Sequence, residues 1–82
     1  MADAEIPERV LEYIASQLVD DQEAVSVEAE HSDGSVDLRL NVGAEDMGRV
    51  IGRRGRNAQA IRTVVRAAGA RAGIDATVDI VD

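Results

Sequence analysis

The first hydrophobic pattern along the chain has the period of a helix. Val10, Ile14 and Leu18 recur at every fourth position, and Leu11 joins them on the same side, which is the pattern of an amphipathic helix. Pro7 suits the first turn of such a helix, where a missing N–H leaves no hydrogen bond unmade. We therefore expect a helix over residues 7–19, with this apolar stripe facing the core.

Two runs with a period of two follow the expected helix. Apolar residues alternate with polar residues over 25–30 and again over 36–42, which is the pattern of strands buried on one face. The four residues between the runs, at 31–34, are His-Ser-Asp-Gly, and their composition is that of a turn. The two runs therefore predict a β-hairpin with one apolar and one acidic face.

The helical period returns after the hairpin, in two parts. A short helix is expected around Val50 and Ile51, and a longer helix over 56–68. A loop over 69–73 and a final alternating strand over 75–81 complete the chain. The positions of the longer helix expected to face the core are Ala58, Ile61, Val65 and Ala68.

This order of elements restricts the fold. The chain of 82 residues has the size of one domain, which we place at residues 1–82. The second and third strands are joined by a two-helix crossover, which makes them parallel. The order α-β-β-α-α-β therefore predicts an α+β domain with a three-stranded mixed sheet, the second strand in its centre and the helices packed on one face.

The composition excludes several kinds of site. The chain has no cysteine and a single histidine, so neither a disulfide framework nor a zinc site is expected. Its glycines are not followed by a Walker A lysine, and it offers no nucleophile–base set of a hydrolase. It lacks an apolar run near the ~18–20 residues of a membrane span. We expect a cytoplasmic, non-catalytic protein with no cofactor, no metal and no membrane association.

The distribution of charge points to a polyanionic partner more than the net charge does. The formal net charge is −7, which alone argues against such a partner. However, the segment 47–74 holds seven arginines and no Asp or Glu, whereas the rest of the chain holds two arginines and sixteen acidic residues. We therefore expect one cationic face on an otherwise acidic body.

The sequence Gly-Arg-Arg-Gly-Arg lies between the two expected helices of the second half. Gly52 and Gly55 allow a tight turn with positive φ and a close approach of a ligand to the backbone. The start of the following helix is an anion site, because its N–H groups are unpaired and its dipole is positive. Arg53, Arg54 and Arg56 are unfavourable there, by about 0.3–1 kcal/mol for each exposed cation, unless an anion binds. The motif by itself favours a plain turn between two helices, and its position in the order α-β-β-α-α-β is what strengthens the interpretation as a binding loop.

At this point the sequence resembles a known family. The stretch Val50–Gly55, followed by Ala58 and Ile61, resembles the Ile-Gly-x-x-Gly signature of KH domains. The order of elements is similar to that of the type II, or prokaryotic, KH fold. Segments 45–52, 60–65 and 78–82 are similar to the bacterial KhpA family in particular, and the resemblance covers nearly the whole chain.

The resemblance implies a function and partners. Members of this family are small cytoplasmic proteins that bind single-stranded RNA and act as RNA chaperones. They form homodimers, pair with a larger KH-containing protein, KhpB, and are linked to cell-envelope homeostasis and cell shape. KH domains clamp about four nucleotides with the Gly-x-x-Gly loop.

The resemblance also implies which residues contact RNA. The loop from Gly52 to Gly55 would hold the RNA backbone. Ile51, Ala58, Ile61 and the neighbouring central strand would form an apolar floor under the bases. Ala58 stands where many KH domains have a bulkier residue, which flattens that floor. Three further arginines, Arg49, Arg62 and Arg66, would extend the phosphate track or simply form a solvated helix face. The full set of expected RNA-binding residues is Ile51, Gly52, Arg53, Arg54, Gly55, Arg56, Ala58 and Ile61, with Arg49 and Arg62 on the track.

Two features leave alternatives open. Gly48 lies inside the expected short helix, and we favour close helix packing over close approach of RNA as its purpose. Ala60, Val64 and Ala67 give the longer helix more apolar surface than one core face needs, which suggests self-association. The alternative function is a protein-interaction adaptor with a KH fold that has lost RNA binding.

Overall fold

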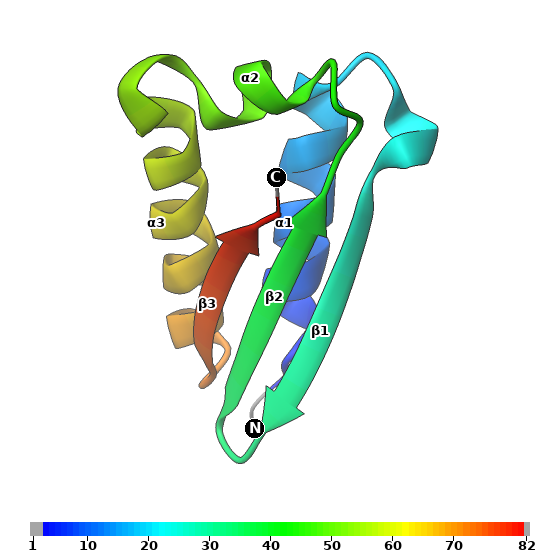
Figure 1. The fold of residues 1–82 in the computed structure, drawn as a ribbon. Helices are drawn as coiled ribbons and strands as arrows, with labels where there is room; N and C mark the ends of the chain where they lie inside the picture. The colour runs from blue at the N-terminus through cyan, green and yellow to red at the C-terminus, as the bar shows by residue number, and fades with distance from the viewer. Residues whose placement is uncertain (1–2, 82) are drawn as a thin grey trace.

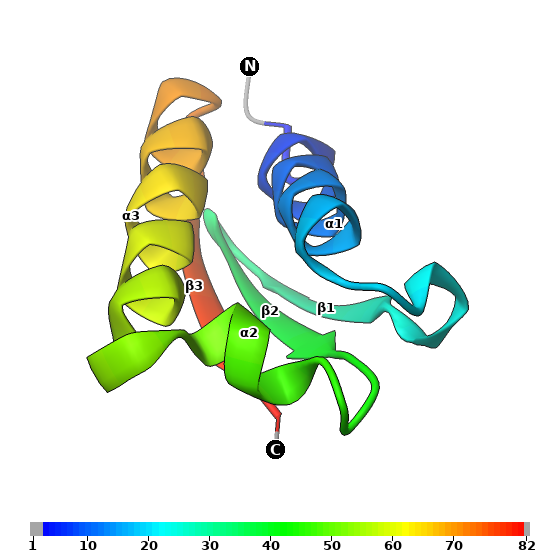
Figure 2. The same cartoon turned by 90° about the horizontal axis from the view of Figure 1, so that it is seen from above.

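Three strands form one mixed sheet, and three helices lie on one of its faces (Figures 1 and 2). The computed structural model describes residues 3–81. The sequence prediction of the order α-β-β-α-α-β is confirmed, apart from two short 3-10 turns at Gln22–Ala24 and Arg53–Gly55. The helices and strands are α1 (Glu5–Leu18), β1 (Ser26–Ser32), β2 (Ser35–Asn41), α2 (Met47–Ile51), α3 (Arg56–Arg71) and β3 (Asp75–Ile80).

The sheet has the predicted topology, with β2 between β1 and β3. The hairpin β1–β2 is antiparallel, whereas β3 runs parallel to β2 with Leu38 opposite Val78. The hairpin turn is tighter than the sequence suggested, because His31 and Ser32 belong to β1. The turn is reduced to Asp33 and Gly34, and Gly34 has a φ of 76°, which glycine adopts without steric cost.

The core lies between β2 and the helices. Val36, Leu38 and Leu40, the alternate residues of β2, are almost completely buried, as the period of two predicted. The buried residues of α1 are Pro7, Leu11 and Ala15, so Leu11 faces the core as predicted. Ala15 has a small side chain, which suits close packing of this line on the core. The other three residues of the expected stripe, Val10, Ile14 and Leu18, are only half-buried at the edge of the core.

Helix α3 is longer than the sequence predicted, because Gly69 belongs to it. Gly69 is buried, and a β-carbon placed on it would lie 2.9 Å from the β-carbon of Ala76 and 2.9 Å from the carbonyl oxygen of Ile74. The absence of a side chain therefore lets α3 lie directly against β3. Gly69 takes the core position that the sequence assigned to Ala68, which is half-buried.

The face of the sheet opposite the helices is polar. Its hollow is lined by Glu28, Glu30, Asp37 and Asp79 around Arg39. These side chains are exposed, as expected for a solvated face. Across residues 3–81, no helix combines the length and the apolar character needed to cross a membrane.

Candidate nucleic-acid interface

The connection between α2 and α3 has an unusual backbone. Gly52, Arg54 and Gly55 have φ values of 76°, 58° and 72°. Arg54 is the one residue other than glycine with a positive φ in the part of the chain that the structure describes. The left-handed region costs a residue with a β-carbon about 1–2 kcal/mol. The loop therefore holds Arg54 in a conformation that local energetics alone would not favour.

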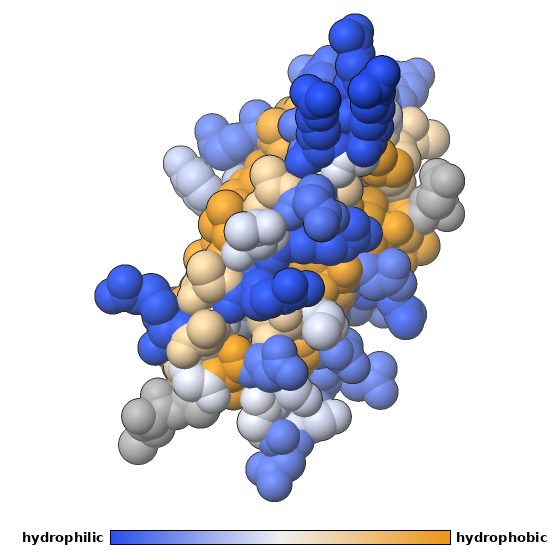
Figure 3. Space-filling model, turned by 90° about the vertical axis from the view of Figure 1, so that its left-hand side faces the viewer, coloured by the Kyte–Doolittle hydropathy of each residue, from blue (hydrophilic) through white to orange (hydrophobic). Residues whose placement is uncertain are grey.

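The loop presents its positive charge to solvent. Arg53, Arg54 and Arg56 are exposed, and none of them forms an ion pair with an acidic residue among residues 3–81. Figure 3 shows strongly hydrophilic side chains gathered at the end of the molecule where Figure 1 places the connection between α2 and α3. Gly55, which precedes α3, provides no side chain to cap the helix. The first N–H groups of α3 and three arginines therefore face the same region, which favours an anion.

Two of the residues expected to form an apolar floor lie in the interior instead. Ala58 is 5% exposed and Ile61 is 3% exposed. Ile61 packs in the core together with Val50 and Val65. The third residue expected in this floor, Ile51, lies directly before the loop and keeps a partly exposed side chain. The first turns of α3 support the loop from below more than they offer a surface to a base.

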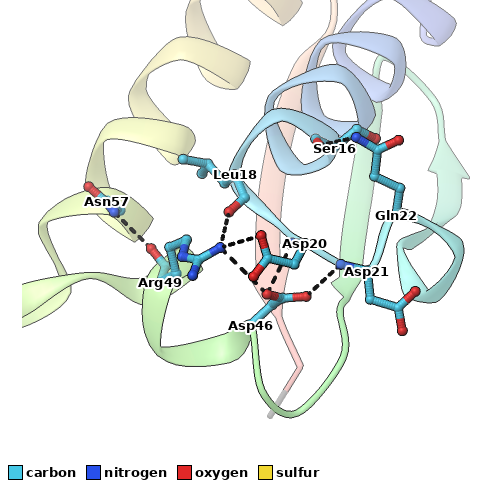
Figure 4. Close-up of polar contacts among 8 residues, drawn as sticks. All are labelled: Ser16, Leu18, Asp20, Asp21, Gln22, Asp46, Arg49 and Asn57. Atoms are coloured by element: carbon cyan, nitrogen blue, oxygen red, sulfur yellow. Dashed lines mark hydrogen bonds and ion pairs between the residues drawn. The ribbon is translucent and has the colours of Figure 1, made fainter.

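Arg49 is engaged by the protein itself. Its guanidinium Nη1 lies 3.2 Å from a carboxylate oxygen of Asp20, and it donates a hydrogen bond to the carbonyl oxygen of Leu18 at 3.3 Å (Figure 4). Asp46 lies on the same side, with a carboxylate oxygen 3.8 Å away. A phosphate would compete with two carboxylates for Arg49. The structure thus places Arg49 apart from the three arginines of the loop, in a network that ties α2 to the end of α1.

Asp46 is the buried carboxylate of this network. It is 4% exposed, and its two oxygens accept hydrogen bonds from the backbone N–H groups of Asp20 and Asp21, each at 3.1 Å (Figure 4). These two N–H groups lower the pKa of the Asp46 carboxyl below its ordinary value; burial acts in the opposite direction, and Arg49 lowers the pKa further. No local pattern in the sequence indicates the partners of Asp46, which lie 25 and 26 residues away.

Arg62 lies across the space between α3 and β3. Its Nε donates to the carbonyl oxygen of Val78 at 3.3 Å, and its side chain is half-buried. Because β3 is an edge strand, this bond satisfies a carbonyl that the sheet leaves unpaired. Arg66, one turn further along α3, is exposed. The structure therefore gathers three of the predicted arginines at the loop and gives Arg49 and Arg62 contacts within the protein.

The packing interpretation of Gly48 is wrong. Gly48 is exposed, and a β-carbon placed on it would meet no atom within 4 Å. The face of α2 that carries Gly48 is open to solvent. The remaining interpretation, an open approach for a ligand beside the loop, is compatible with this position.

The sequence analysis missed Asn57, which contacts the loop directly. Its side-chain Nδ2 donates a hydrogen bond to the carbonyl oxygen of Arg49 at 2.8 Å (Figure 4). A β-carbon on Gly52 would lie 2.7 Å from the Cγ of Asn57. The only signal in the sequence is a short amide side chain two positions after Gly55, a place where many polar residues would serve equally well.

The fold and the loop together define a class of protein domain. A Gly-x-x-Gly connection between two helices, in the order α-β-β-α-α-β with a mixed sheet covered on one face, is a type II KH domain. The chain belongs to the KhpA/KhpB KH-domain family, whose model matches residues 8–80.

Individual relatives agree with this assignment. The chain is 46% identical over 72 residues to the RNA-binding protein KhpA of Clostridium perfringens, covering 88% of this chain and 96% of that protein. It is 51% identical over 59 residues to the KhpA of Caldanaerobacter subterraneus, covering 72% of this chain and 79% of that protein. It is 40% identical over 75 residues to the KhpA of Bacillus subtilis, covering 92% of this chain and 93% of that protein. The family is not one of enzymes, so the prediction of a non-catalytic protein is confirmed by these relatives.

Proposed function

We propose that this protein binds single-stranded RNA without catalysis and holds the RNA backbone at the loop from Gly52 to Gly55. One observation carries the proposal. The loop at the start of α3, which has residues with positive φ, and the residue after it carry three exposed arginines. These arginines form no ion pair with an acidic residue among residues 3–81. Membership of the KhpA/KhpB family and relatives named as RNA-binding proteins support it.

Binding would proceed through charge and backbone contact. Phosphates of the RNA accept hydrogen bonds from the first N–H groups of α3 and from Arg53, Arg54 and Arg56, which relieves the mutual repulsion of these arginines. The exposed Gly48 leaves the backbone of α2 open to the nucleotides. Ile51 offers apolar contact to a base, and the guanidinium of Arg62 retains donors for a phosphate further along the strand.

The direct test reverses the charge of the loop while keeping both glycines. In Arg53→Asp/Arg54→Asp, affinity for a short single-stranded RNA should fall at least about tenfold, because two phosphate contacts become repulsive. Asp tolerates the left-handed conformation at position 54 better than most residues, so the variant should stay folded. Fluorescence anisotropy at two salt concentrations measures affinity, and circular dichroism measures folding.

A matched variant controls for net charge. Arg9→Glu/Arg71→Glu changes the charge by the same amount at two exposed positions away from the loop, on α1 and in the last turn of α3, and it should keep most of the affinity. The wild-type affinity should fall with salt at a log–log slope of about −2 if roughly three phosphates are neutralised. If the loop variant binds as well as the control, the clamp is not at this loop. If the wild type does not bind RNA, the proposal is overturned.

We further propose that the working form is a homodimer in the cytoplasm, with RNA chaperone activity and a role in the cell envelope and cell shape. An apolar groove between α1 and α3 supports self-association: Val64 at its rim is 48% exposed. A second copy is the occupant proposed here, and a larger KhpB-like protein would compete for the same face. The residues that line the groove are Ile14, Leu18, Asn57, Ala60, Ile61 and Val64.

The same groove favours the alternative function, a protein-interaction adaptor that does not bind RNA. The acidic body of the chain, with a net charge of −7, agrees with that function. The loop variant separates the two, because an adaptor would keep its partner binding after the charges of Arg53 and Arg54 are reversed.

A further inference from the structure

Helix α2 is too short to satisfy its own backbone. It spans Met47–Ile51, and a helix leaves its last four carbonyl groups without intrahelical partners. The carbonyl of Gly48 accepts a hydrogen bond from the N–H of Gly52 at 2.8 Å. The carbonyl of Arg49 accepts one from the side chain of Asn57, also at 2.8 Å. The end of α2 is therefore completed by a side chain that belongs to α3.

The same side chain occupies the space beside the first glycine of the loop. A β-carbon on Gly52 would lie 2.7 Å from Cγ, 2.9 Å from Cβ and 2.9 Å from Nδ2 of Asn57. Gly55, by contrast, has nothing within 4 Å of the corresponding position. Gly52 is thus required for its positive φ and also because Asn57 crosses the loop at this point.

Few other hydrogen bonds fix the loop. Within it, the N–H of Gly55 donates to the carbonyl of Gly52 at 3.1 Å. For residues 3–81, the bond from Asn57 is the only side-chain hydrogen bond that joins α2 to α3. Arg54 meanwhile stays in the left-handed region, a conformation that persists only where the surroundings enforce it.

The residue that Asn57 binds is itself anchored to the body of the protein. The guanidinium of Arg49 contacts the carbonyl of Leu18 and the carboxylates of Asp20 and Asp46 (Figure 4). Its backbone carbonyl, on the other side of the residue, accepts the hydrogen bond from Asn57. Asn57 therefore connects the start of α3 to a point that is fixed relative to α1.

We infer that Asn57 is a positioning residue that holds the Gly52–Gly55 loop in the conformation that receives RNA. This inference rests on the proposed function. Asn57 need not touch RNA: its amide fixes the end of α2 relative to the first turn of α3, and thereby the direction of the arginines between them. A loop that is already ordered loses less conformational freedom on binding.

The test compares Asn57→Ala with the isosteric Asn57→Asp. Both variants lose the N–H donor to the Arg49 carbonyl. Alanine has the highest helix propensity, and an acid in the first turn of a helix is favourable, so neither should lower the melting temperature. Gln59→Ala and Gln59→Glu are the matched controls, because Gln59 is exposed in the same turn of α3 and its side chain forms no hydrogen bond to the loop or to α2 among residues 3–81.

Two readouts separate the outcomes. Hydrogen exchange at the amides of Gly52 and Gly55 should become about 3- to 10-fold faster in both Asn57 variants and stay unchanged in both controls. RNA affinity by anisotropy should fall about 3- to 10-fold in Asn57→Ala relative to Gln59→Ala. An acid should reduce RNA affinity more at position 57 than at position 59, because the carboxylate of Asn57→Asp also faces the carbonyl of Arg49. The loss of affinity from Asn57→Ala to Asn57→Asp should therefore be larger than the loss from Gln59→Ala to Gln59→Glu.

The inference and the proposed function can fail separately. If loop exchange and RNA affinity match those of the controls, Asn57 does not position the loop, even though the protein binds RNA. If the melting temperature falls and exchange quickens throughout the protein, Asn57 has a general structural role, and the inference is overturned. If the wild type binds no RNA while the Asn57 variants speed loop exchange, the proposed function fails but the contact itself is real.

Discussion

Gly48 and Gly69 are both helical glycines, and their surroundings give them opposite roles. Gly48 faces solvent in α2, with no atom near the position of a side chain. Gly69 is enclosed between α3 and β3, where a β-carbon would meet Ala76 and Ile74 at 2.9 Å. A contact that close requires the neighbouring backbone to move. The same substitution should therefore have opposite effects at the two positions.

Gly69→Ala should lower the free energy of unfolding by about 1–3 kcal/mol, because overpacking outweighs the better helix propensity of alanine. Gly48→Ala should raise it by about 0.5–1 kcal/mol, since nothing opposes the gain in propensity. Urea unfolding followed by circular dichroism measures both. A Gly69→Ala protein as stable as the wild type would mean that α3 does not depend on this close approach.

At the scale of elements, short helix α2 is held by carboxylate and amide contacts to its neighbours. Asp46 binds the backbone that follows α1, and Asn57 completes the other end of α2 from α3. A helix of five residues has little stability of its own. Its position, and hence the start of the loop, depends on these polar contacts.

The Asp46 contact predicts a dependence of stability on pH. The folded state lowers the pKa of this carboxyl below the ordinary 3.8, so its stabilisation is fully present above that value and is lost as pH falls through the lower, folded-state pKa. Wild type should therefore melt at a higher temperature than Asp46→Asn near neutral pH, and the difference should shrink at pH values below 3.8.

Thermal unfolding from about pH 6 to about pH 2 measures this difference. Asp33→Asn, in the exposed hairpin turn, is the control, and its melting curve should follow that of the wild type. A difference in melting temperature between wild type and Asp46→Asn that stays constant over the whole pH range would contradict the assigned role of the carboxylate.

At the scale of the whole molecule, charge and apolar surface are separated in space. Three exposed arginines, at 53, 54 and 56, meet solvent at the α2–α3 loop. Four acidic residues, at 28, 30, 37 and 79, lie on the open face of the sheet, and an apolar groove lies between α1 and α3. RNA bound at the loop would leave the sheet face exposed. Such an arrangement suits a small protein that binds RNA at one place and a second copy at another.

The dimer proposal predicts the effect of a charge in the groove. Val64→Glu should convert a dimer to a monomer and leave the fold intact, because Val64 is 48% exposed and Glu is a good helix former. Size-exclusion chromatography with light scattering measures the mass, and Thr63→Glu, exposed on a neighbouring position of α3, is the control. A wild type that remains monomeric at high concentration would overturn the proposal.

The sequence by itself determined the order of elements, the sheet topology and the Gly-x-x-Gly loop with its arginines. Period-two and period-four patterns are local, and the parallel pairing of β2 with β3 follows from the crossover between them. The family was also evident, because its signature is a continuous stretch of residues ending at Gly55.

Only the tertiary structure decided which polar residues support the loop and which apolar residues reach the surface. Asp46 and its partners on the chain after α1 lie 25 and 26 residues apart, and Arg62 meets Val78 across 16 residues. No local pattern records such contacts, because they depend on how the helices pack. The same packing buried Ile61, turned Gly69 into a core residue and brought Asn57 across Gly52.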